Sequence, residues 1–338
     1  MLKKQIKNLW QLCFNDSDAF TDLYFTHRYN NDVNICIQSG EEIISALQML
    51  PYQMTFCSNE VPTSYISGAC THPDYRGKGV MRELLSQAFA QMQSQGVLFS
   101  TLIPASDYLF DYYRKNGYAS VFNYTEENYF TKDLTLNSKE LRIEAVTDFK
   151  EDIYNYVSHR MEERPCCIQH TVADFQVILT DLKLANGSIF TATRGKNICG
   201  VAFCYPNEQT LQVNELLADN TETEQALLNE AARQWKCDEI TVIRPLKKGA
   251  EKLHLGMARI IDAKKVLQLF AATFPQEEMN IELTDDTLAA NNGYYYMNNG
   301  KCMKSGERLP GTHQRLNIEM LTLKIFAPLQ PYMSLMLN

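Results

Sequence analysis

The stretch THPDYRGKGVMR, residues 71–82, decides how the first part of this chain is interpreted. It follows a strand-like run at residues 64–71. It opens a helix whose apolar side chains recur at helical spacing over residues 79–93. Such a turn leaves unpaired backbone N–H groups at the positive end of the helix. The stretch therefore predicts a pyrophosphate site, and a basic surface turn that uses glycine for its geometry is the alternative interpretation.

The side chains of the turn support the anion site. Gly77 and Gly79 remove the side chains that would keep an anion away from the backbone. Arg76, Lys78 and Arg82 add positive charge around the same backbone. The turn thus combines N–H donors with cations, which is the combination that a pyrophosphate requires.

The flanking segments predict a mixed α+β domain. Residues 4–29 have helical periodicity, with a break and capping residues at 15–18, and strand-like runs follow at 34–38 and 43–50. After the helix, residues 97–103 resemble a buried strand and residues 106–115 a short helix that ends at Asn116-Gly117. The order is helices, antiparallel strands, and then a strand–turn–helix–strand–helix unit.

This order, together with the basic turn and the segment YYRKNGY at residues 112–118, resembles the GNAT superfamily of N-acetyltransferases. Arg76 and Gly79 match the pyrophosphate signature [Q/R]xxGx[G/A], whereas Met81 stands where glycine or alanine is usual. The resemblance implies acetyl-CoA as cosubstrate and no metal. It also implies that the strand at 97–103 splays away to admit the pantetheine arm.

The segments at residues 61–64 and 73–82 resemble more closely the enhanced-intracellular-survival (Eis) acetyltransferases, which also have bulky residues after the loop glycine and a following arginine. That family has an active GNAT domain, a degenerate second one and a sterol-carrier-like C-terminal domain. Residues 141–243 repeat the order of strands and helices, and the remainder forms a small α+β unit. The resemblance implies domains at residues 1–135, 136–255 and 256–338.

Details of these later regions add three expectations. Residues 133–139 are expected to be a connector, and NNG at 291–293 and at 298–300 are hairpin signals. In the second copy, the turn at residues 218–224 has no arginine or glycine and carries three acids. These acids would repel a pyrophosphate, so the second copy is expected to be catalytically silent and to buttress the first.

Composition bounds the function. The chain has 338 residues, a formal net charge of −8 and 45% hydrophobic residues, which predicts two or three packed domains and argues against a nucleic-acid partner. No run approaches the roughly 18 apolar residues of a membrane span, and the N-terminus lacks the apolar core of a secretory signal. The ten cysteines show no CxxC and the histidines no metal-ligand spacing. We expect reduced thiols and a cytoplasmic location.

The resemblance assigns a set of residues to acetyl-CoA. The backbone of one strand is expected to contact the thioester and the pantetheine arm, and the basic turn to contact the pyrophosphate. The assigned residues are Ala69, Cys70, Thr71, Arg76, Gly77, Lys78, Gly79, Val80, Met81, Arg82 and Ser106. Cys70 has no partner histidine at a recognisable spacing, so a packed thiol is preferred over a nucleophile.

Tyr113 is the expected general acid, because it stands four residues before Gly117, where Eis-like families keep their acid tyrosine. A tyrosine hydroxyl, with a pKa of about 10, suits protonation of the CoA thiolate. A merely packed aromatic residue is the alternative. The neighbouring Tyr118 is the other tyrosine to be tested as the general acid.

The general base is less defined. Residues 63–71 carry no acid, and Glu60 lies just ahead of them. In Eis-like families the C-terminal carboxylate returns to the active site as the base, which would place this role on Asn338. The usual terminal aromatic residue is absent here, although the tail at residues 331–338 is unusually apolar. A tail packed on its own domain, Glu60 and a water chain are the alternatives.

The expected reaction is direct transfer of an acetyl group to an amine of a small cationic molecule or a basic peptide. The alternative is an acyl-CoA-binding regulatory or scaffold module without turnover. The expected partner is therefore an amine-bearing substrate, and a homo-oligomer is left open.

Overall fold

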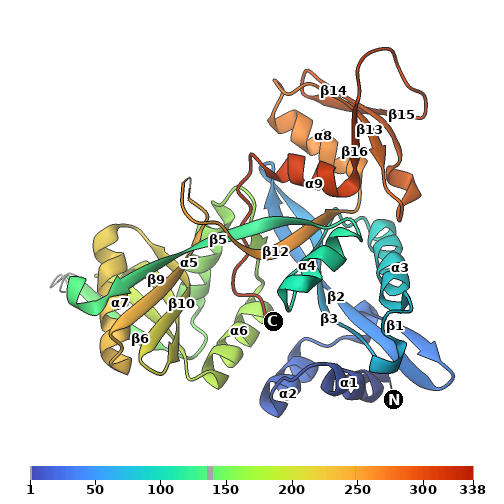
Figure 1. Cartoon of the computed structure of the whole chain (residues 1–338). Coiled ribbons are helices and arrows are strands. Elements are labelled where there is room, and N and C mark those ends of the chain that lie inside the picture. The colour runs from blue at the N-terminus through green and yellow to red at the C-terminus, as the bar shows by residue number, and fades with distance from the viewer. Residues whose placement is uncertain (1, 135–139, 248, 338) are drawn as a thin grey trace. The chain divides into compact units, whose positions relative to one another are not determined.

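The computed structural model describes residues 2–134, 140–247 and 249–337. The chain forms two compact units, one of Met1–Phe122 and His254–Pro331, and one of Asn123–Leu253 and Tyr332–Leu337 (Figure 1). It passes from the first to the second within strand β5 (Ala119–Phe130) and returns within strand β12 (Leu253–Ile260). The expected connector begins in a short 3-10 helix, η3 (Thr131–Asp133), and residues 135–139 lie outside the described residues.

The first unit is built on a sheet in the order β1-β2-β3-β4-β12. The strands that precede β5 in sequence are β1 (Asn34–Ser39), β2 (Glu42–Phe56), β3 (Asn59–Thr71) and β4 (Phe99–Leu102), and η1 (Asn31–Val33) leads into β1. Helices α1 (Leu2–Cys13) and α2 (Asp18–His27) pack on one face, against Ala46 and Cys70. Helices α3 (Val80–Ser94) and α4 (Asp107–Arg114) pack against Leu47 and Ile66 on the other. Neighbouring side chains of one strand point to opposite faces, so the sheet lies between these two layers.

Strand β3 carries a bulge near its C-terminal end. The register with β2 moves from Ser67 opposite Gln48 to Cys70 opposite Ala46, so two residues of β3 lie opposite one of β2. Gly68, in this bulge, has φ +60, and a Cβ there would lie 2.2 Å from the Trp10 ring. Only glycine allows α1 to pack this closely on the strand.

Strand β12 was not expected as part of this sheet. It pairs antiparallel with β4, from Met257 opposite Leu102 to Ile260 opposite Phe99. The domain boundary expected at residue 256 therefore falls inside a strand of the first unit. The alternation of Met257, Arg259 and Ile261 gives no sign of where a partner strand lies, because that partner is more than 150 residues earlier.

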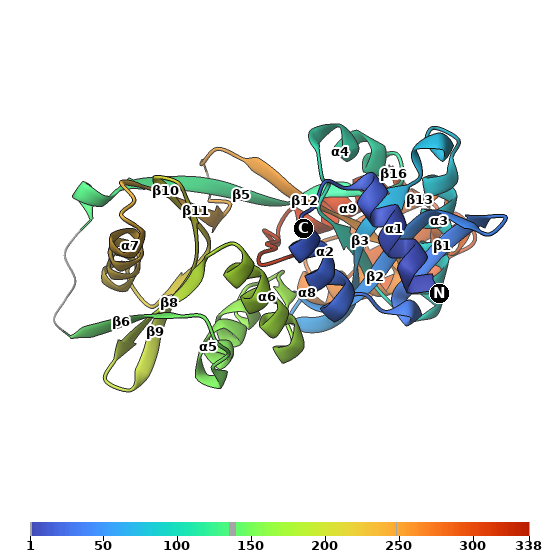
Figure 2. The same cartoon turned by 90° about the horizontal axis from the view of Figure 1, so that it is seen from below.

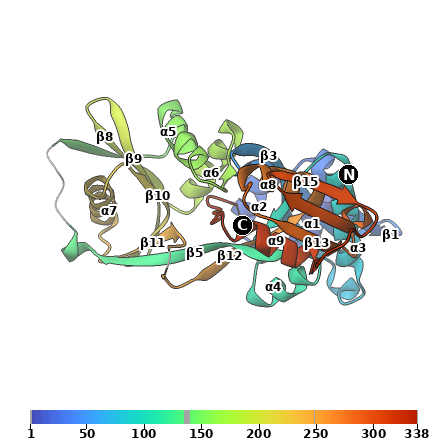
Figure 3. The same ribbon diagram turned by 90° about the horizontal axis from the view of Figure 1, so that it is seen from above.

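After β12 the chain forms a small sheet with two helices (Figure 3). The strands β13 (Met279–Thr284), β14 (Gly293–Asn298), β15 (Lys301–Ser305) and β16 (Gln314–Asn317) take the order β15-β14-β13-β16. The helices are α8 (Ala263–Thr273) and α9 (Ile318–Phe326). The NNG signal at 298–300 is confirmed as the β14–β15 turn.

The hairpin signal at residues 291–293 is wrong. These residues run from the last residue of a short 3-10 helix, η4 (Ala289–Asn291), to the first residue of β14, at the end of a longer connection from β13. The Asn291 side chain accepts a bond from Ala263 N and donates to Ile261 O and Asp285. Asn291 therefore makes hydrogen bonds to residues distant in the sequence and does not form a tight hairpin turn.

The second unit repeats part of the order of elements, as predicted: two helices, three strands, a helix and a strand. Its strands follow the order β5-β11-β10-β9-β8-β6. The elements are β6 (Leu141–Val146), α5 (Glu151–Glu162), β7 (Ile168–Gln169), α6 (Val172–Leu184), β8 (Ser188–Arg194), β9 (Asn197–Asn207), β10 (Thr210–Ala218), α7 (Thr221–Trp235) and β11 (Glu239–Pro245). Helix α7 packs on one face, with Ala202, and α5 and α6 on the other, with Val201 (Figure 2). The fold of the whole chain is thus mixed α+β.

The described tail, residues 332–337, packs within the second unit. Tyr332 N donates to Cys166 O at 2.8 Å, and Ser334 Oγ donates to the buried carboxylate of Glu215 at 2.6 Å. Glu215 also receives both terminal nitrogens of Arg164, at 2.8 and 2.9 Å. The tail is therefore held by a backbone hydrogen bond and by the bond from Ser334 to the carboxylate of a buried ion pair.

Candidate active site

The basic turn continues β3 into α3 through a short 3-10 helix, η2 (Pro73–Tyr75). Gly77 has φ +74 and Gly79 has φ +83. A Cβ at either position would meet nothing within 4 Å, so backbone conformation and not space is the reason for glycine here. The two left-handed residues turn the chain sharply into the helix.

The first turn of α3 is open. Its N-cap is Gly79, which supplies no side-chain cap, and the first intrahelical bond is from Glu83 N to Gly79 O at 3.0 Å. The N–H groups of Val80, Met81 and Arg82 thus have no partner within the helix. Together with the helix dipole they form an anion-binding end.

The equivalent helix of the second unit is closed instead. Asn220 caps α7, and its side chain accepts from Thr223 N at 2.9 Å. Asp219, beside it, binds Arg160 at 2.9 Å and the Tyr156 hydroxyl at 3.0 Å. A side chain thus occupies an N–H group that the first turn leaves open, and the nearby cation Arg160 is already paired.

A cavity of about 880 Å³ brings the expected cofactor residues together. All eleven of them line it, and so does Tyr113. Asn338 lies outside the described residues. The cavity wall also contains residues that the sequence did not single out: Cys13, Phe14, Tyr75, Ala105, Tyr108, Leu109 and Tyr112.

The two central strands separate beside this cavity. β3 and β4 pair in parallel from Thr63 opposite Phe99 to Tyr65 opposite Thr101. β3 then runs on to Thr71 through its bulge, whereas β4 ends at Leu102. The bulge takes backbone groups at Gly68 and Ala69 out of the ladder, next to the cavity that Ala69 lines.

Arg76 is held in place by its own strand. Its Nε donates to the Thr71 carbonyl at 3.0 Å, which leaves its terminal nitrogens for another partner. Lys78 lies over the ring of Tyr75, with Nζ 5.2 Å from the ring centroid. Both cations are therefore positioned near the open end of α3.

Tyr113 is buried except for 8% of its surface. Its ring meets those of Tyr112 and Tyr118 edge to face, with centroids 5.5 and 5.6 Å apart. Burial raises the pKa of Tyr113 well above its ordinary value, so the hydroxyl keeps its proton throughout the neutral range. Tyr118 is not part of the cavity wall, and its hydroxyl pairs with Ser100 Oγ at 2.6 Å.

Cys70 has the character of a packed thiol. A hydrogen bond with Cys13 and burial both raise its pKa well above the ordinary value. The protonated form therefore dominates, which fits the preference for packing over nucleophilic catalysis.

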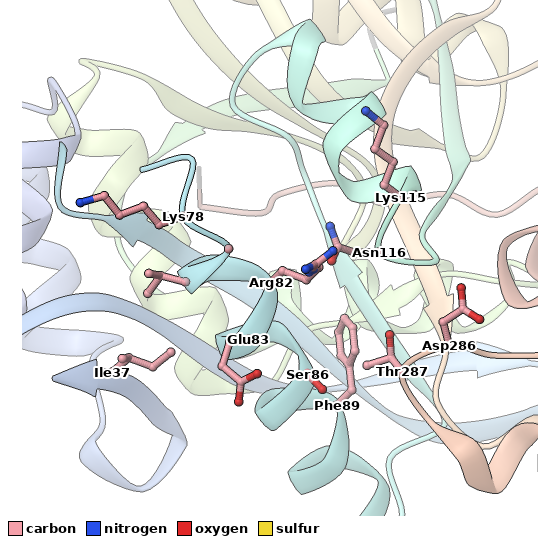
Figure 4. A pocket seen from close by; sticks show the side chains of 12 residues that line it. Ile37, Lys78, Arg82, Glu83, Ser86, Phe89, Lys115, Asn116, Asp286 and Thr287 are labelled. Atoms are coloured by element: carbon pink, nitrogen blue, oxygen red, sulfur yellow. The ribbon is translucent and has the colours of Figure 1, made fainter. Parts of the chain in front are cut away.

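A second cavity, of about 640 Å³, adjoins the other side of the turn. Lys78, Arg82 and Lys115 supply its positive charge, with Glu83 and Asp286 as its acids (Figure 4). Sequence reasoning missed Lys115, which caps the C-terminal end of α4. Its position directly before the Asn116-Gly117 turn was the available signal.

No carboxylate lines the larger cavity within the part of the chain that the structure describes. Glu60 lies opposite Thr55, at the far end of the β2–β3 hairpin. Nine residues of strand separate it from Ala69, which is roughly 30 Å at the usual rise per residue. Glu60 is therefore too distant to take a proton in this cavity.

No three histidine, cysteine, aspartate or glutamate side chains among the described residues form a group that could hold a metal ion. No helix within the same residues is both long and apolar enough to cross a bilayer.

Comparison with known proteins gives the family of this site. Residues 3–121 match the model of the acetyltransferase (GNAT) domain. No curated protein matches the chain by sequence.

The fold is similar to several solved structures. A GCN5-related N-acetyltransferase from Anabaena variabilis has a TM-score of 0.77 at 18% identity, covering 98% of this chain and 96% of the other. One from Kribbella flavida has a TM-score of 0.78 at 17% identity, covering 99% and 95%. Eis1 from Mycobacterium abscessus has a TM-score of 0.75 at 12% identity, covering 95% and 86%. These likenesses show the fold, and together with the match of residues 3–121 to the GNAT domain model they support an acyltransferase.

Proposed function

We propose that this protein is an acetyl-CoA-dependent N-acetyltransferase that transfers the acetyl group directly to an amine. One observation carries the proposal. The open end of α3, the bulge of β3 and the buried hydroxyl of Tyr113 line a single cavity of about 880 Å³. A nucleotide thioester needs an anion site, a slot for its arm and a proton donor for its leaving thiolate, and the cavity wall offers all three.

The chemistry follows from these positions. The pyrophosphate binds the N–H groups of Val80–Arg82 with help from Arg76. The pantetheine arm runs along the part of β3 that β4 has left. The neutral amine attacks the thioester carbonyl, and backbone N–H groups near the bulge stabilise the oxyanion. The C–S bond then breaks, and Tyr113 donates its proton to the CoA thiolate.

The amine must lose a proton, and the base is a separate part of the proposal. The terminal carboxylate of Asn338 is the expected base, and a water chain is the remaining alternative now that Glu60 is distant. Appending three glycines after Asn338 moves that carboxylate. Unchanged turnover at saturating acetyl-CoA would assign the role to water.

The acceptor is proposed to be a small cationic molecule or a basic peptide. The described cavity wall is aromatic and basic, and Arg76, Lys78 and Arg82 are its charged side chains. Any carboxylate that binds a cationic acceptor would therefore have to come from residues outside this cavity wall. An amine panel that spans cationic, neutral and acidic acceptors tests the substrate class directly.

The domain roles are proposed on the same basis. We assign catalysis to residues 1–135, a silent GNAT-like copy to residues 136–255 and a sterol-carrier-like unit to residues 256–338, of which residues 256–260 also belong to strand β12 of the first sheet. The closed N-terminus of α7 supports the silence of the second copy. Ten free cysteines support work in a reducing compartment such as the cytoplasm.

The decisive experiment alters the turn. Gly79→Asp places a carboxylate at the open end of α3 and imposes φ +83 on a residue with a side chain. Calorimetry should show loss of acetyl-CoA binding in a folded variant. Gly195→Asp is the matched control, because Gly195 has φ +65 and equally open surroundings in the second unit.

Thiol release from acetyl-CoA completes the test. Amine-dependent release in the wild type, lost in Gly79→Asp and kept in Gly195→Asp, supports the proposal. Binding of acetyl-CoA without release for any amine would favour a binding module. Unchanged affinity of Gly79→Asp for acetyl-CoA would refute the assignment of the pyrophosphate site to the N-terminus of α3.

A further inference from the structure

Two cysteines lie together in the wall of the large cavity. Cys13 ends α1, and Cys70 lies on β3, the strand against which α1 packs. Both line the cavity, and both belong to one packed cluster of side chains. Cys13 is partly exposed, whereas Cys70 is buried. A reagent in the cavity would therefore meet Cys13 first.

The Thr71 carbonyl oxygen holds Cys13 beside a cation. Cys13 Sγ lies 3.4 Å from this oxygen, and Arg76 Nε lies 3.0 Å from the same atom. The Cys70 hydrogen bond, and then Arg76 and His72, outweigh the effect of burial and lower the pKa of Cys13 from 9.0 to about 6. At neutral pH Cys13 therefore has a larger thiolate fraction than an ordinary cysteine.

The other partly exposed cysteines differ. Burial raises the pKa of Cys36 above its ordinary value and that of Cys302 to about 11. The remaining seven cysteines, Cys70 among them, are buried. Cys13 therefore combines access, a cationic neighbour and a second thiol, which no other cysteine does among the residues that the structure describes.

We propose that Cys13 and Cys70 form a reactive dithiol, a site of covalent modification by low-molecular-weight disulfides. The Cys13 thiolate attacks one sulfur of the disulfide, forms a mixed disulfide and releases a thiolate. Cys70 then gives its proton to that thiolate and attacks the Cys13 sulfur. The Cys13–Cys70 bond forms, and the second thiolate leaves. Two protein thiols are oxidised, and one small disulfide is reduced to two thiols.

This modification goes beyond acetyl transfer and does not depend on it. It would join the end of α1 to β3 across the cavity wall, next to the Arg76 guanidinium that is proposed to bind the pyrophosphate. Covalent modification of Cys13 and binding of acetyl-CoA would then compete for the same part of the cavity wall.

The test uses the reduced full-length protein and oxidised glutathione at pH 6.5, with peptide mapping by mass spectrometry. Cys13 should react on the order of tenfold faster than Cys36, since its larger thiolate fraction outweighs the lower nucleophilicity of a more acidic thiol. The end product in the wild type should be a Cys13–Cys70 disulfide.

Three variants sharpen the result. In Cys70→Ser the reaction should end at the mixed disulfide between Cys13 and glutathione. In Cys13→Ser, Cys70 should remain unmodified, and Cys36→Ser should give the same product as the wild type. Equal rates at Cys13 and Cys36 in the wild type would overturn the proposal. So would a mixed disulfide on Cys13 that never closes to Cys70. Both refuting results come from the wild type, so a misfolded variant cannot obscure them.

Discussion

Removal of the Arg259 guanidinium should destabilise the first unit more than removal of any exposed cation. Arg259 is 1% exposed on β12, and its Nη2 lies 2.6 Å from Asp285 Oδ1. Its Nη1 donates to the Asn116 carbonyl at 3.1 Å, and its guanidinium carbon lies 4.6 Å from the centre of the Phe89 ring. One side chain thus joins the sheet, the turn after α4 and the C-terminal sheet.

The magnitude follows from the burial of both partners. Arg259→Met would leave the Asp285 carboxylate buried, 1% exposed, with only neutral donors. Breaking one side of a buried ion pair costs about 3–5 kcal/mol. For a unit of this size each kcal/mol lowers Tm by roughly 2–4 °C, so the expected fall is about 6–20 °C. Calorimetric and urea unfolding both measure it.

Arg315→Met is the matched control. Arg315 pairs with Glu282 at 3.1 Å but is 80% exposed, so its loss should cost at most about 1 kcal/mol. Adding Asp285→Leu to Arg259→Met should recover part of the stability, because the stranded charge is gone. A fall for Arg259→Met no larger than that of Arg315→Met would refute the reasoning.

Three further changes test other features. Tyr113→Phe should lower kcat on the order of 10²-fold with little change in acetyl-CoA affinity. If Tyr118→Phe shows this loss and Tyr113→Phe does not, Tyr118 and not Tyr113 is the general acid. Gly68→Ala should cost about 2–4 kcal/mol in urea unfolding, because its Cβ would lie 2.2 Å from the Trp10 ring at φ +60. Arg164 and the hydrogen bonds to Glu215 hold its pKa below the ordinary 4.5 against the opposing effect of burial. The stabilisation from this carboxylate should be complete above about pH 4.5 and be lost as pH falls through the lower folded value, so a Glu215→Gln variant with the same acid dependence as the wild type would contradict it.

Local patterns made most of the first unit predictable. The helix after the basic turn and the strands around it follow from apolar periodicity, and the open helix end follows from Gly77 and Gly79. The expected cofactor residues were close in sequence, so the turn alone brought most of them together. Ser106 and Tyr113 required the family resemblance, because α4 reaches the cavity only through tertiary packing.

Non-local pairings were beyond the sequence. Cys13 lies within the helical periodicity of residues 4–29, and its acidity depends on where α1 meets Cys70 and Arg76. Arg259 lies three residues after the expected boundary at residue 256, and its role depends on Asp285 and Asn116. For both residues the role depends on contacts with residues distant in the sequence, which hydrophobic periodicity does not predict.

Strand β12 has a consequence for synthesis on the ribosome. It arrives after the 131 residues Asn123–Leu253 of the second unit. At usual translation rates the first unit waits about 7–26 s for it. During that interval β4 has an unpaired edge, to which another nascent chain could bind. A fragment cut at residue 121, where the family match ends, would keep this edge permanently and should aggregate, so expression trials should retain the chain through residue 331.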